Sequence, residues 1–69
     1  MIKLVSIDGG TTDEKVCTVF ADTKEEVPET GSATEVKGLV GTLSAGSIVY
    51  TAKLEVALLK SDDTWEWGE

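Results

Sequence analysis

The stretch that decides the fold is residues 48–67, IVYTAKLEVALLKSDDTWEW. In its first half, over residues 48–58, every second side chain is apolar. This period of two is typical of a β-strand that packs one face on a core. The run is long enough for one strand, or for two strands with a bend near residues 52–53. The row expected to face the core is Ile48, Tyr50, Ala52, Leu54, Val56 and Leu58.

The second half of this stretch predicts a turn and a short strand. Residues 61–64 (SDDT) are turn-forming, and Trp65 and Trp67 lie on one face of the strand after them. If the two aspartates of the turn form the loop, Leu58 lies opposite Trp67. Lys60 then lies opposite Trp65, and both tryptophans share the apolar face of the preceding strand. The last third of the chain is therefore expected to be a β-hairpin.

The remainder of the chain predicts further short elements divided by turns. Residues 2–7 and 14–21 are rich in β-branched and apolar side chains, so we expect two strands there, the second of them central. Residues 22–27 fit at most one short helical turn, with Asp22 as its N-cap. Residues 36–40 are expected to pair briefly as an edge strand.

Together these elements indicate an all-β fold, a small antiparallel barrel or sandwich of five to six short strands. Residues 1–69 have room for a single domain, and a chain this short has little margin of stability. Cys17 is the one cysteine, so it forms no internal disulfide. With no histidine in the chain, a structural zinc site is not expected either. We expect reinforcement from a protein partner or from further copies of the chain in a homo-oligomer.

The charge of the chain excludes several kinds of partner. Thirteen acidic and six basic residues give a net charge of −7 at pH 7. Nucleic-acid binding needs basic surface to neutralise phosphates, so no nucleic-acid partner is expected. No apolar run approaches the ~18 residues of a membrane span, and the first residues lack the apolar region of a signal peptide. We therefore expect no membrane partner and a location in the cytoplasm of the producing cell.

The most distinctive local motif is IDGGTT, in which Asp8 is the second residue. It resembles the first phosphate loop of the actin, hexokinase and sugar-kinase superfamily, where a strand ends in Asp and a Gly- and Thr-rich hairpin holds nucleotide phosphate. The resemblance implies that Asp8 would face a metal and that Gly10, Thr11 and Thr12 would contact the phosphate. It covers about residues 4–21, and the family's second phosphate loop has no counterpart. A hairpin turn is the simpler interpretation, and a nucleotide- or phosphate-binding fragment is an alternative function.

No combination of residues predicts catalysis. Cys17 lies in an apolar strand and has no histidine to activate it, so it is expected to be a small buried side chain. The acidic residues do not follow the spacing of a calcium-binding loop. We therefore expect no catalytic residues, no metal and no cofactor, and a chain that is not an enzyme.

The two tryptophans allow two interpretations. They can close the core and stabilise the hairpin through cross-strand pairs. They can also form an aromatic contact with a partner subunit or with a sugar, because aromatic side chains are enriched in binding hot spots. A carbohydrate-binding module that uses both is a further alternative. The candidate partner-binding residues are Trp65, Trp67, Lys60 and Tyr50.

From Phe20 onwards the chain resembles the short structural proteins of tailed bacteriophages and Gram-positive prophages. The resemblance is carried by residues 21–27 (ADTKEEV), 45–52 (AGSIVYTA) and 58–67 (LLKSDDTWEW). Head-fibre, decoration and tail-associated modules of phages often finish with an apolar strand, an Asp- or Gly-containing turn and a tryptophan-bearing strand. The resemblance implies a non-catalytic virion or prophage module that acts through protein–protein contacts, as an oligomer or docked on a capsid or tail protein.

Overall fold

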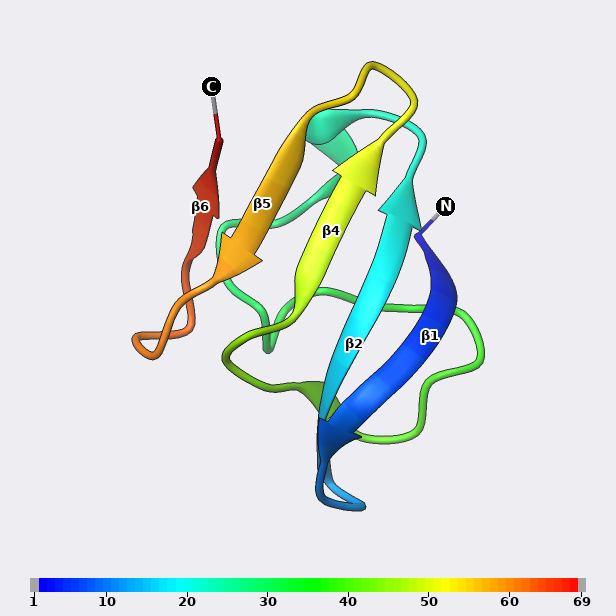
Figure 1. Ribbon diagram of the computed structural model, residues 1–69, viewed down its shortest axis with the longest axis vertical. Helices are drawn as coiled ribbons and strands as arrows, with labels where there is room; N and C mark the ends of the chain where they lie inside the picture. Colours follow the sequence, from blue (N-terminus) through cyan, green and yellow to red (C-terminus); the bar gives the residue numbers. More distant parts are fainter. Residues whose placement is uncertain (1, 69) are drawn as a thin grey trace.

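A computed structural model describes residues 2–68 as one β-sheet with a single short helical turn (Figure 1). In chain order the elements are β1 (Lys3–Gly10), β2 (Glu14–Ala21), the 3₁₀ turn η1 (Lys24–Glu26), β3 (Thr42–Leu43), β4 (Ile48–Thr51), β5 (Val56–Leu59) and β6 (Trp65–Trp67). The prediction of an all-β fold with at most one helical turn is confirmed.

The sheet is mixed rather than wholly antiparallel. Its strands follow the order β1-β2-β4-β5-β6, and β3 pairs with the first residues of β2. The pairs β1/β2, β4/β5 and β5/β6 are antiparallel, whereas β2 runs parallel to both β3 and β4. Parallel pairing arises because the long connection after β2 carries the chain back across the molecule before β4 begins.

This connection, residues 22–41, crosses one face of the sheet. It pairs with residues at both edges of the sheet, near β1 and near β6. In Figure 1 it passes behind the sheet, mainly as the green trace. Lys37 pairs with Lys3 of β1 through an isolated bridge. Thr30 pairs with Thr64, directly before β6, through a second one. The sheet and its own connection therefore enclose the space between them.

The core fills that space. Its buried side chains are Ile2, Cys17, Val19, Ala21, Val36, Leu43, Val49, Ala57, Leu59 and Trp65. Because side chains alternate along a strand, the residues between these core positions point to the other face of the sheet. That second face is the one turned toward the viewer in Figure 1.

The row of apolar side chains that was expected to face the core faces outward instead. Leu58 and Val56 are 47% and 46% exposed, whereas Leu59 is 1% exposed. The expected bend between two strands does form, and Leu54 lies in it, 90% exposed and with a φ of 64°. The bend also removes Lys53 from the strands, so the odd-numbered row of β4 and β5 contains only small, hydroxyl or aliphatic side chains and can be buried.

The predicted hairpin forms, but its register differs by one residue. Trp65 pairs with Leu59 and Trp67 with Ala57, so neither Leu58 nor Lys60 lies opposite a tryptophan. The loop holds three residues rather than two, and its last residue has a φ of 68°, as in hairpins that close with a left-handed residue. A one-residue slip exchanges the two faces of a strand, which is why the tryptophans share the face of Leu59.

Two other sequence-based expectations need correction. The N-cap of the helical turn is Thr23 rather than Asp22, and its side chain makes no capping hydrogen bond; the Asp22 N–H donates to the carboxylate of Glu26 at 2.8 Å. Residues 36–40 do not form an edge strand, because their only strand-like pairing is the isolated bridge of Lys37 with Lys3. The short strand that pairs with β2 after the connection is β3. No helix in residues 2–68 has the length and apolar composition to cross a membrane.

Both β3 and β4 pair with β2, and Ser47 makes hydrogen bonds to β2 in the gap between them. Its side chain is fully buried. The Cys17 N–H donates to Ser47 Oγ at 3.2 Å, and the hydroxyl donates to the Ser44 carbonyl at 2.7 Å. The hydroxyl thus replaces a hydrogen bond that a neighbouring strand would otherwise supply to β2.

Ser47→Ala is expected to lower the free energy of unfolding by about 1–3 kcal/mol, because the Cys17 N–H then remains buried without an acceptor. Urea unfolding monitored by tryptophan fluorescence measures the loss. The matched control is Ser61→Ala in the exposed hairpin loop, which is expected to leave the midpoint unchanged. Equal midpoints for both variants would contradict the role given to Ser47.

Candidate functional site

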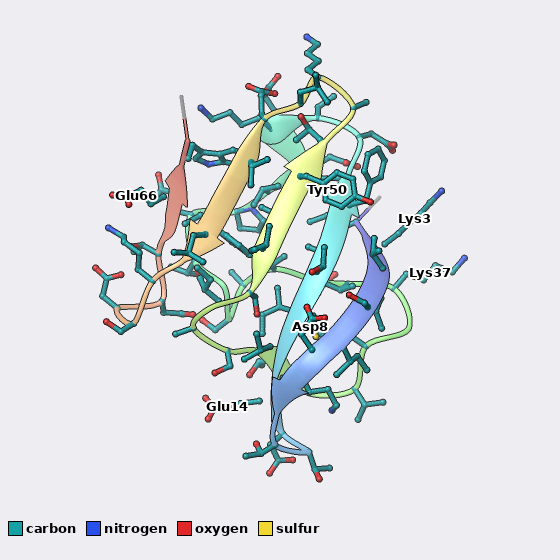
Figure 2. The ribbon with its side chains drawn as sticks, viewed as in Figure 1. Lys3, Asp8, Glu14, Lys37, Tyr50 and Glu66 are labelled. Carbon is teal, nitrogen blue, oxygen red and sulfur yellow. The ribbon has the colours of Figure 1, made fainter. Side chains whose placement is uncertain are left out.

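The outward face of β2, β4 and β5 carries a contiguous apolar surface. We define the outer patch as Phe20, Ile48, Tyr50, Val56 and Leu58. Ile48, Val56 and Leu58 are 38%, 46% and 47% exposed. Phe20 and Tyr50 are half-buried against each other, with ring centres 5.2 Å apart and an edge-to-face angle of 64°. Figure 2 shows Tyr50 on this open face of the sheet.

Strand pairing arranges this face in two rows that run across the strands. The first row is Lys3, Phe20, Tyr50 and Val56. The second row is Ser6, Thr18, Ile48, Leu58 and Glu66. Each row therefore places apolar side chains in the middle and polar or charged side chains at one or both ends.

Charged groups lie at the margins of the outer patch. Asp8 lies at the β1 end of the second row, where Ser6 Oγ and Thr18 Oγ1 donate to its carboxylate at 3.1 Å and 3.0 Å. Lys3 and Lys37 project together past the edge of β1, and Glu66 lies at the β6 side (Figure 2). The two hydroxyl groups hold the Asp8 carboxylate in place on the sheet.

The Gly- and Thr-rich motif forms the turn between β1 and β2. The Thr11 N–H donates to the Glu14 carbonyl at 2.6 Å, and the Glu14 N–H donates to Thr11 Oγ1 at 3.1 Å. Lys15 Nζ donates to the carbonyl of Thr12, and also to that of Val40 at 2.5 Å. Gly10 has a φ of 94° and closes the hairpin. Polar groups of the motif therefore already have hydrogen-bond partners within the protein, which favours its interpretation as a hairpin turn.

The four candidate partner-binding residues do not form one surface. Trp65 is 8% exposed, and its Nε1–H donates to Thr34 Oγ1 at 3.1 Å, so it is part of the core. Trp67 is half-buried on the same face of the sheet. Tyr50 lies on the opposite face, and Lys60 directly precedes the hairpin loop, where its N–H donates to the Thr64 carbonyl. Trp67 and Tyr50 therefore offer more aromatic surface to a ligand than Trp65, which is 8% exposed.

Trp67 borders a groove of about 520 Å³ between β6 and the start of the connection. Its walls include Lys24, Glu25, Val27, Pro28, Glu29 and Trp67. Lys24 Nζ lies 5.1 Å from the centre of the Trp67 ring. Residues 24–29 were not among the candidates, because nothing in the sequence indicates that they lie beside a strand about 40 residues further along the chain.

The ionisable groups near the hairpin have structural roles. Asp62 accepts hydrogen bonds from Thr64 Oγ1 at 2.6 Å and from the Thr64 N–H, and the side-chain bond lowers the pKa of Asp62 below its usual value. The Asp63 carboxylate accepts from Ser32 Oγ at 2.6 Å and ties the loop to the connection. Burial raises the pKa of the Cys17 thiol, which opposes formation of a nucleophilic thiolate.

Two candidate surfaces therefore lie on opposite sides of the sheet: the outer patch and the Trp67 groove. The first is apolar with charged margins. The second combines an aromatic ring with one lysine and two glutamates. Comparison of the chain with models of known protein families, with curated proteins and with solved structures found no match.

Proposed function

We propose that the chain is a non-catalytic structural or interaction module of the phage or prophage type, and that it acts through protein–protein contacts made by the outer patch. The observation that carries the proposal is the outer patch itself. Within residues 2–68 the connection covers only the opposite face of the sheet. Scattered exposed apolar side chains are ordinary, whereas a contiguous group on a regular sheet face is typical of an interaction surface.

The occupant that we propose for the outer patch is a second copy of the chain. The molecule measures 30 × 24 × 19 Å, and Figure 1 looks down the shortest axis onto this face of the sheet. The outer patch occupies only part of this face, so an interface of the usual size, roughly 800 Å² on each partner, extends over the flanking side chains of β1 and β6 as well. A chain of 69 residues with one cysteine also has few other means of gaining stability than association.

The charged side chains at the margins of the outer patch favour one twofold arrangement of two copies over another. A twofold axis that runs across the strands, between the two rows, places the first row of one copy over the second row of the other. Lys3 then faces Asp8 of the second copy, twice in the dimer, and Tyr50 meets Ile48. A twofold axis along the strands would place Asp8 over Glu66 and oppose like charges. The first arrangement is isologous and electrostatically complementary, so it is the one that we propose.

In sedimentation equilibrium, the unmodified chain is expected to associate to dimers, and Leu58→Glu is expected to give monomers, because a carboxylate in the middle of the patch cannot be desolvated without a partner charge. Lys3→Glu alone is expected to weaken the dimer about tenfold, since it replaces two attractions by two repulsions. Combining it with Asp8→Lys is expected to restore association.

The matched control is Val40→Glu, a change of the same kind at a residue that is 75% exposed and outside the patch. It is expected to leave association unchanged. A chain that remains monomeric at about 1 mM, where even weak specific association is detectable, would contradict the proposal. So would failure of the Lys3 and Asp8 double variant to recover any of the affinity lost in Lys3→Glu, provided that circular dichroism shows both to be folded.

A further inference from the structure

We infer that the Trp67 groove binds a cationic side chain, an exposed arginine or lysine of a partner polypeptide. The groove lies on the core side of the sheet, beside β6, and does not include any residue of the outer patch. The inference therefore concerns a separate site from the self-association proposed for the outer patch, although Trp67 also borders a hollow with Val56 and Leu58 of that patch.

The first argument is that the ring of Trp67 already holds a cation. Lys24 Nζ lies 5.1 Å from the ring centre, within the ~6 Å range of a cation–π interaction. Lys24 is exposed and Trp67 is half-buried, so the contact lies at the surface, where an external group can exchange with it. The lysine side chain thus occupies the position that a ligand's cation would take.

The second argument is the charge of the groove walls. Glu25 and Glu29 line the same groove as Lys24, so the walls have more negative than positive charge even with the lysine present. The net charge of −7 on the whole chain adds a field of the same sign. These charges attract a cation and repel an anion, which favours a basic segment over an acidic one.

The third argument is the shape and support of the groove. Val27, Pro28 and the Trp67 ring provide apolar surface for the aliphatic stem of an arginine or lysine. The volume of about 520 Å³ lies within the usual range for a binding pocket. The Trp65 N–H donates to the Glu29 carbonyl at 3.2 Å and holds the two walls together. The two walls are therefore already joined before a ligand binds, and the rearrangement that binding requires is displacement of the exposed Lys24 side chain.

The inference is tested with blocked Ala-Arg-Ala and with its neutral counterpart, Ala-citrulline-Ala, by following amide shifts in NMR titrations. The arginine peptide is expected to shift residues 24–29 and 64–67, and the citrulline peptide is not. Lys24→Met removes the internal cation and keeps the length of the side chain. It is expected to tighten binding of the arginine peptide about two- to five-fold, which corresponds to an exposed cation–π contact.

Glu29→Gln is expected to weaken binding several-fold, and Trp67→Leu to abolish it in a chain that circular dichroism shows to be folded. The matched control is Glu66→Gln, which removes the same charge on the neighbouring strand but on the other face of the sheet. Equal weakening by the Glu29 and Glu66 variants would show a general effect of net charge and overturn the inference. Unchanged or weaker binding by Lys24→Met would overturn it as well.

Discussion

Leu59→Ala is expected to lower the free energy of unfolding by about 2–5 kcal/mol, the usual cost of emptying a fully buried leucine site. Leu59 is 1% exposed and packs closely on Gly31. A Cβ added to Gly31 would lie 2.4 Å from Leu59 Cδ2. It also lies opposite Trp65 in the hairpin. A chain of this size has a total stability of only a few kcal/mol, so most of the variant is expected to be unfolded at room temperature.

The control for this prediction is its neighbour Leu58, which is 47% exposed. Leu58→Ala is expected to cost less than about 1 kcal/mol, because it removes no core contact and creates no cavity. Guanidinium unfolding monitored by tryptophan fluorescence measures both, at a low protein concentration that keeps association out of the comparison. A larger loss for Leu58→Ala than for Leu59→Ala would mean that the even-numbered row faces the core after all.

Gly10→Ala is expected to cost about 2–4 kcal/mol, from a left-handed backbone and an overpacked contact together. The φ of Gly10 is 94°, and a Cβ at this position would lie 2.4 Å from the Glu14 carbonyl oxygen and 2.8 Å from Lys15 Cα. Both are backbone atoms of the paired strand, so relief requires the hairpin itself to open. Gly9→Ala is the matched control, because nothing lies within 4 Å of a Cβ built there.

The same pair of variants bears on the alternative of a phosphate loop. If Gly10 serves the hairpin, the alanine variant loses stability whether or not phosphate is present. If Gly10→Ala is as stable as Gly9→Ala, the hairpin does not require the glycine, and the structural role given to Gly10 is contradicted. A titration of the unmodified chain with ATP and magnesium then decides the alternative, since phosphate binding would shift the amide resonances of Gly9, Thr11 and Thr12.

Much of the secondary structure could be predicted because it follows from neighbouring residues. The strand expected at residues 14–21 is β2, with the same bounds. The single helical turn lies within residues 22–27, as expected, although its N-cap is Thr23 rather than Asp22. The two strands of the 48–58 segment and the hairpin after them also form. Each of these depends on the preferences of residues that are adjacent or a few positions apart.

The candidate site could be predicted only in part. Of the candidate contact residues, Tyr50 lies on an open face of the sheet, whereas Trp65 is a core residue. The grouping of Lys24 with Trp67 could not be foreseen from spacing. Which face of a strand is buried depends on what packs against it, and a strand with apolar side chains on both faces satisfies either choice locally.

The sequence by itself thus determined that this protein is all-β, where most of its strands lie and that residues 56–67 form a hairpin. Only the tertiary structure decided the buried face, the parallel pairing and the two candidate surfaces. The contacts responsible are long-range: Trp65 with Thr34 and Ser32 with Asp63 each join residues 31 positions apart. Local preference acts between neighbours, whereas burial is decided by whichever distant segment excludes water from a face, and here that segment is the connection after β2.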